Sequence, residues 1–86
     1  MTLEFRKKYT IVKSIIDNFQ DKPFTIGEIY LLSDQAARNN GIIITPDDVI
    51  GIILDLYDSF DINKEVAEGN VIRYRNNNLN ATVSGR

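Results

Sequence analysis

Residues 45–75 read TPDDVIGIILDLYDSFDINKEVAEGNVIRYR. This stretch contains apolar residues at helical spacing, followed by apolar residues that alternate with polar ones as in a β-strand. The stretch opens with an N-cap hydroxyl at Thr45, proline at the first helical position, and the carboxylates of Asp47 and Asp48 at the positive end of the helix dipole. These features predict a helix from Pro46 to about residue 60. The predicted core stripe of this helix comprises Val49, Ile53, Leu56 and Phe60, flanked by Ile50, Tyr57 and Ile52.

After this helix the spacing changes to alternation, across residues 63–66 and 71–75. Glycine at the first loop position suits a type II′ turn, so we predict a β-hairpin closed by a two-residue turn at Gly69 and Asn70. Tyr74 alternates with arginines and is predicted to be a buried partner of Ile72.

The two-residue turn predicts a definite strand register. It places Val66 opposite Arg73 and Lys64 opposite Arg75. The second pair brings like charges together, which favours a bulge or a solvent-exposed strand edge.

Two more helices are predicted upstream. Residues 4–19 repeat apolar side chains at spacings of four and three, which indicates an amphipathic helix. Thr25 and Glu28 form a capping box that starts a second helix, which ends near Asn39. The expected apolar stripes are Phe5, Tyr9, Val12, Ile16 and Phe19 in the first helix, and Ile29, Leu32 and Ala36 in the second. Residues 42–44, all isoleucine, are compatible with a strand or with an extended buried link.

Composition excludes several kinds of chemistry. The chain has 86 residues, 43% of them hydrophobic and 26% charged, which indicates one ordinary globular domain. Cysteine, histidine and tryptophan are absent, so zinc sites of the Cys/His kind, thiol nucleophiles, disulfides and Ser-His triads are ruled out. The paired aspartates have no nucleophile or phosphate loop near them in sequence, and a weak calcium-loop match at residues 58–65 lacks the required glycine. We therefore expect no enzyme, no metal, no cofactor and no small-molecule substrate.

The first residues lead directly into a cluster of basic side chains without an apolar stretch, so we expect no signal peptide. No apolar run approaches the length of a membrane span. The expected location is cytoplasmic.

The charges are distributed unevenly along the chain. Residues 1–13 carry +3, residues 41–72 carry −6 with Lys64 among seven carboxylates, and residues 73–86 carry +3, although the whole chain is only −2. Such asymmetry indicates either a bipolar interaction surface or ordinary scatter in a short chain.

The predicted order of elements is a helix, a short extended piece, two helices and a hairpin. This is the element order of the winged helix-turn-helix superfamily, which this chain resembles over residues 4–75. The resemblance is architectural, without a shared motif, and implies an α+β fold: a three-helix winged helix-turn-helix domain with a C-terminal β-hairpin wing. It also implies that Phe24 and Thr25 form a short strand that pairs with the hairpin, and that residues 45–60 form the recognition helix. We predict one winged-helix-like domain over residues 1–76 and a flexible polar tail over 77–86.

Two features depart from the DNA-binding pattern of that superfamily. The link between residues 39 and 45 is longer than in a tight helix-turn-helix. The recognition helix carries no lysine or arginine, and its outer face would repel DNA phosphates. Its outward residues instead predict a protein interface with a small apolar patch and an acidic rim, consisting of Asp47, Gly51, Leu54, Asp55 and Asp58.

Two functions follow from the sequence. The first is a small DNA-binding regulator that uses basic residues of the wing and of the first helix, namely Lys64, Asn70, Arg73, Arg75, Arg6, Lys7 and Lys13. The second is a protein-interaction module, an adaptor or inhibitor that uses the acidic face of the third helix, with a homodimer as one form. The superfamily's common use favours DNA as the partner, and the charge distribution favours a protein. We take DNA binding as the predicted function and protein interaction as the alternative.

Overall fold

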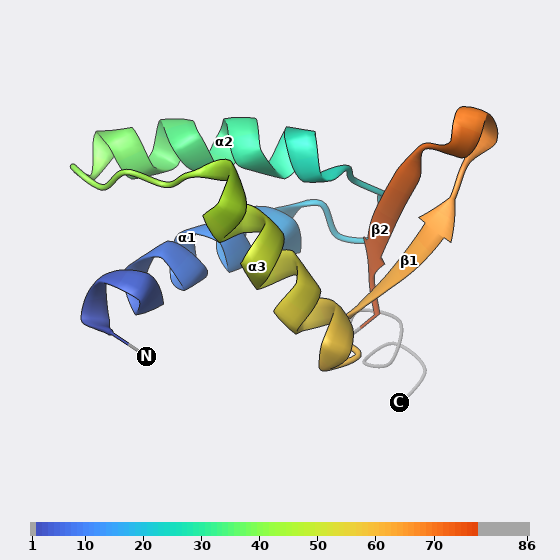
Figure 1. The fold of residues 1–86 in the computed structure, drawn as a ribbon, viewed down its shortest axis with the longest axis horizontal. Helices are drawn as coiled ribbons and strands as arrows, with labels where there is room; N and C mark the ends of the chain where they lie inside the picture. The colour runs from blue at the N-terminus through green and yellow to red at the C-terminus, as the bar shows by residue number, and fades with distance from the viewer. Residues whose placement is uncertain (1, 78–86) are drawn as a thin grey trace.

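The computed structural model describes residues 2–77, which form three helices followed by an antiparallel hairpin (Figure 1). The elements are α1 (Leu3–Asn18), α2 (Ile26–Asn39), α3 (Pro46–Asp58), β1 (Ile62–Val66) and β2 (Ile72–Asn76). This confirms the predicted α+β class with a wing-like hairpin, and the arrangement is compatible with a winged-helix architecture. In Figure 1 the hairpin and the first turns of α1 lie at opposite ends of the molecule.

The starts of α2 and α3 follow from local sequence. The Thr25 hydroxyl accepts the Glu28 backbone N–H at 3.1 Å, and the Glu28 carboxylate accepts the Thr25 N–H at 2.8 Å. Thr45 and Asp48 form the same reciprocal pair in front of α3, where Pro46 is the first helical residue. Each box satisfies N–H groups that a helix cannot bond internally, so both starts are fixed within four residues.

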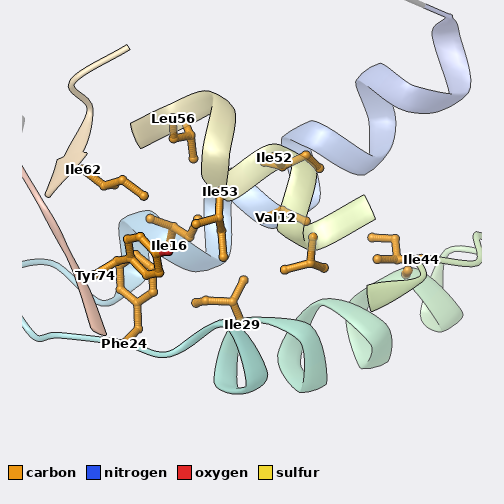
Figure 2. Close-up of a cluster of buried hydrophobic side chains, with 12 residues drawn as sticks. Val12, Ile16, Phe24, Ile29, Ile44, Ile52, Ile53, Leu56, Ile62 and Tyr74 are labelled. Atoms are coloured by element: carbon orange, nitrogen blue, oxygen red, sulfur yellow. The ribbon is translucent and has the colours of Figure 1, made fainter. Parts of the chain in front are cut away.

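The core lies where the three helices and the base of the hairpin meet (Figure 2). In the figure, the Phe24 and Tyr74 rings lie together at the hairpin end and Ile44 lies at the other end. Residues 42–45 form no strand, so the isoleucine run is an extended link in which Ile44 is buried and Ile43 exposed. The fully buried core side chains come from every part of the fold: Val12, Ile16, Phe24, Ile29, Ile44, Val49, Ile52, Ile53, Leu56 and Ile62.

The predicted buried face of α2 is wrong by one residue. Ile29 is buried as expected, but Leu32 is partly exposed, and the next buried positions are Ser33 and Ala37. Both stripes satisfy helical spacing, and the contacts of α2 with α1 and α3 select the one with small side chains. The Ser33 hydroxyl is fully buried and has no hydrogen-bond partner.

Ser33→Ala is expected to stabilise the protein by about 1 kcal/mol or more, because the substitution removes a buried hydroxyl without a partner and adds helix propensity. Urea unfolding at neutral pH measures the change. Ser14→Ala on the exposed side of α1 is the matched control, with a gain of at most about 0.5 kcal/mol. Equal gains at the two positions would show that burial of the Ser33 hydroxyl is not costly.

The predicted burial of Phe60 is also wrong. The helix ends at Asp58 rather than near residue 60, and Phe60 adopts a φ of 63° that turns the chain toward β1. Its side chain is consequently 81% exposed. The buried stripe of α3 comprises Val49, Ile52, Ile53 and Leu56.

The hairpin differs from the predicted two-residue turn. Its loop is one residue longer, a 3₁₀ turn of Glu68–Asn70 in which Gly69 and Asn70 both have positive φ. The longer loop shifts the register by one residue, so the repulsive pairing of Lys64 with Arg75 does not form. The observed pairs are Ile62 with Asn76, Asn63 with Arg75, Lys64 with Tyr74, Glu65 with Arg73, and Val66 with Ile72.

Tyr74 is buried as predicted, whereas Ile72 is about half exposed, because the hairpin extends beyond the core. The predicted pairing of Phe24 with the hairpin is confirmed by a bridge to Tyr74, with two backbone hydrogen bonds of 2.8 Å. The two rings stack with centroids 6.2 Å apart.

Asn76 at the end of β2 closes the core. Its side chain is buried, and its Nδ2 donates to the backbone carbonyls of Ile16 at 2.8 Å and Gln20 at 2.9 Å. Ile16 lies in the last turn of α1 and Gln20 two residues beyond its end, so Asn76 bonds the segment in which the helical hydrogen-bond pattern stops. Asn77, the first residue of the predicted tail, donates through its N–H to the Asp61 carbonyl at 2.9 Å; the rest of that tail lies outside the described residues.

Candidate interaction surfaces

The outward side of α3 carries a line of large apolar side chains. Ile50, Leu54 and Tyr57 recur at spacings of four and three and are 37%, 47% and 37% exposed. We call these three residues the α3 stripe. The sequence predicted Leu54 as exposed, whereas Ile50 and Tyr57 were expected to flank the core. They are partly exposed because α1 and α2 together cover less than the full apolar arc of the helix.

All five residues of the predicted protein interface are exposed. Asp47 and Asp58 border the α3 stripe at its two ends, while Gly51 lies beside its centre. A Cβ atom added at Gly51 would meet nothing within 4 Å, so packing within the monomer does not require glycine there. Asp55 lies nearer to α1 and accepts a hydrogen bond from the Tyr9 hydroxyl at 3.2 Å. Burial, together with this bond to a carboxylate, raises the pKa of Tyr9 above its ordinary value.

The apolar surface continues from α3 onto one face of the hairpin. The ring of Tyr57 meets that of Tyr74 edge to face, with centroids 6.5 Å apart, and Lys64 Nζ lies 5.4 Å from the Tyr57 centroid. Farther along the same hairpin face, the cross-strand pair Val66 and Ile72 is exposed. Sequence alternation could identify this pair as apolar but not as exposed, because exposure depends on how far the hairpin extends beyond the helices.

The inner edge of α3 is attached to α1 by an ion pair. Lys8 Nζ donates to the Asp48 carboxylate at 3.1 Å, and both side chains are largely shielded from solvent. Burial alone would raise the pKa of Asp48. Hydrogen bonds from the Thr45 backbone and from Lys8 outweigh it, so the pKa lies below its ordinary value.

Asp48→Asn is expected to lower the free energy of unfolding by about 1 kcal/mol at neutral pH, because the amide keeps an acceptor for Thr45 but loses the charge that faces Lys8. Since the pKa of Asp48 is lower in the folded state, the advantage of the wild type is complete above about pH 4 and is lost as the pH falls through the folded value. Urea unfolding across this range measures the difference. A gap that stays constant with pH would mean that the ion pair contributes nothing.

The residues predicted to contact nucleic acid do not lie together on one surface of the structure. Arg73 and Arg75 share the outer face of the hairpin, where Arg75 pairs with Glu65 at 3.0 Å and also donates to the Asp21 carbonyl. Lys64 lies on the opposite hairpin face, over Tyr57. Asn70 lies in the loop at the hairpin tip.

The predicted residues of the first helix lie apart from the hairpin group. The first turns of α1, which carry Arg6 and Lys7, are at the far end of the molecule from the hairpin (Figure 1). Lys13 pairs with Asp17 one turn along the same helix, at 3.2 Å. The hairpin cations and those of the first turns therefore form two separate groups.

Arg6 and Lys7 lie on the rim of a shallow depression of about 540 Å³. We call this depression the basic hollow. Within residues 2–77, neither Arg6 nor Lys7 forms an ion pair. The other lining residues are Leu3, Ile11 and Ile42, which are apolar, and Thr10 and Asn40.

No protein-family model, curated protein or solved structure matches this chain. Over the described range, no helix has the length and apolar character needed to cross a membrane. Among residues 2–77, no three acidic side chains gather closely enough to hold a metal ion.

Proposed function

We propose that this chain is a winged-helix domain that binds another protein through the outer face of α3 and the adjoining face of the hairpin, without catalysing a reaction. One observation carries the proposal: the helix in the recognition position exposes the α3 stripe between aspartates and has no lysine or arginine. An apolar centre with a polar rim is the usual anatomy of a protein interface.

The same face is poorly suited to a nucleic acid. Asp47, Asp55 and Asp58 would face phosphates or base edges that carry mostly hydrogen-bond acceptors. Burial of Leu54 and Tyr57 against an apolar partner would instead release water from a large hydrophobic area. Exposed Gly51 leaves room for the backbone or side chain of that partner.

DNA binding is the second candidate, and one observation favours it. Arg73 and Arg75 lie together on the outer hairpin face, where a wing contacts the sugar-phosphate backbone in DNA-binding members of the superfamily. Glu65 already pairs with Arg75 and lies opposite Arg73, which reduces the charge available to phosphate. For this reason we rank it second.

A photo-crosslinking amino acid at Leu54 is expected to attach to a partner protein in the cells from which this chain comes. The same amino acid at Leu31, an exposed leucine on α2, is the matched control and should attach at least about tenfold less, because the carboxylates beside it, Glu28 and Asp34, already bond to Thr25 and Arg38. When Gly51→Gln is combined with the crosslinking residue at position 54, attachment should fall, because the glutamine side chain occupies the space left for the partner. The same substitution should stabilise the fold by up to about 1 kcal/mol, because glutamine favours a helix more than glycine does. Loss of attachment with a raised Tm excludes unfolding as its cause.

Two results would contradict the proposal. One is equal attachment at Leu54 and Leu31. The other is salt-sensitive binding of random duplex DNA, tight at about 50 mM salt and weak at about 200 mM, that Arg73→Ala with Arg75→Ala abolishes. That second result would establish the DNA-binding candidate instead.

A further inference from the structure

We infer that the partner of the α3 stripe is a second copy of this chain, which receives the stripe in its basic hollow. The inference rests on the proposed function, because it names the partner of the same surface. It starts from the charge asymmetry of the sequence, with an excess of basic residues at positions 1–13 and of acidic residues at 41–72.

The two surfaces are complementary in chemistry. The hollow combines three apolar side chains with polar ones, and its two cations, Arg6 and Lys7, are free of ion pairs within residues 2–77. The α3 surface has an exposed leucine, Leu54, with the carboxylates of Asp47 and Asp58 on either side. Insertion of Leu54 into the hollow would bring the unpaired cations to these carboxylates and cover Leu3, which is 68% exposed.

The two surfaces of one molecule cannot meet each other. Lys8 and Tyr9 form the side of α1 that contacts α3. Leu3, Lys7 and Thr10 project from the opposite side, because successive residues of a helix are rotated by about 100°. Contact between the surfaces therefore requires two molecules and is head to tail, which leaves one surface of each kind free and permits further addition.

Sedimentation velocity tests this arrangement with two variants. Arg6→Glu with Lys7→Glu reverses the charge of the hollow, and Leu54→Ser with Asp58→Asn removes the apolar and acidic features of the α3 surface. We expect the wild type to associate progressively between about 10 μM and about 1 mM, and less at high salt. Each variant alone should remain monomeric. An equimolar mixture should form a dimer and no larger species, because it contains one intact surface of each kind.

A control variant, Lys22→Glu with Arg73→Glu, changes the net charge by the same amount as the hollow variant, Arg6→Glu with Lys7→Glu. Its substitutions lie outside both surfaces, so it should associate like the wild type. The inference is overturned by a monomeric wild type over the whole range, by variants that associate normally, or by a mixture that forms no dimer. Those results leave the proposed function standing if Leu54 still crosslinks to a different protein. A symmetric dimer through α3 alone would be recognised because the hollow variant would still dimerise.

Discussion

Asn76→Asp is expected to lower the free energy of unfolding by about 3 kcal/mol or more at neutral pH. In the wild type, the buried amide donates two hydrogen bonds to the carbonyls of Ile16 and Gln20. An aspartate of nearly the same shape would direct carboxylate oxygens at those carbonyl oxygens, and it has no N–H to donate. The penalty is large because the site is shielded from water, so the charge is poorly solvated.

The pH dependence distinguishes this mechanism from a packing defect. Burial raises the folded-state pKa of the introduced carboxyl, so its destabilising effect is greatest above that pKa and declines as the group becomes protonated toward about pH 4. Urea unfolding of both proteins at several pH values measures this. Gln35→Glu, the same amide-to-acid change at an exposed position of α2, should cost less than about 0.5 kcal/mol. An equally small cost at Asn76 would show that its two hydrogen bonds are unimportant.

Phe24→Ala is expected to destabilise the protein by about 3–5 kcal/mol, a large part of the stability of a domain this size. The Phe24 side chain is fully buried, stacks on Tyr74 and meets Phe19 edge to face with centroids 5.5 Å apart. Truncation leaves a cavity at the junction between the helices and the hairpin. We therefore expect the hairpin to open more readily than the helices.

Hydrogen exchange can locate this effect. The Tyr74 N–H donates to the Phe24 carbonyl, so its protection should fall by at least the loss in global stability. Phe60→Ala is a matched control, because the same side chain is removed from a position that is 81% exposed, and its cost should stay below about 0.5 kcal/mol. Similar losses from Phe24→Ala and Phe60→Ala would contradict the assignment of Phe24 to the core.

The two interaction surfaces depend on tertiary packing to different extents. The α3 stripe lies on one regular helix, so capping and helical spacing position it without help from distant residues. The basic hollow combines side chains of α1 with Asn40 and Ile42 from the link after α2, so it exists only when α1 and that link pack together. Loss of tertiary packing would accordingly abolish the hollow before it altered the order of side chains along α3.

Local sequence was sufficient to predict where α2 and α3 start and which acidic side of α3 is exposed. Thr25 with Glu28 and Thr45 with Asp48 bond to partners three residues away, so no distant contact is needed to fix either start. The outward direction of Asp47, Asp55 and Asp58 follows from the period of the helix once Val49, Ile53 and Leu56 are assigned to the core.

The remaining features depend on contacts between residues far apart in the chain. Leu32 and Ser33 both fit a helical stripe, and the positions of α1 and α3 around α2 select the smaller side chain. The hairpin register depends on one extra loop residue, which aligns Lys64 with Tyr74 over the core. Asn76 carried no local signal because its partners lie 60 and 56 positions earlier. Hydrogen bonds between residues three positions apart form within one segment, so local sequence determines them. The buried face of α2, the hairpin register and the hydrogen bonds of Asn76 depend on how the whole fold packs.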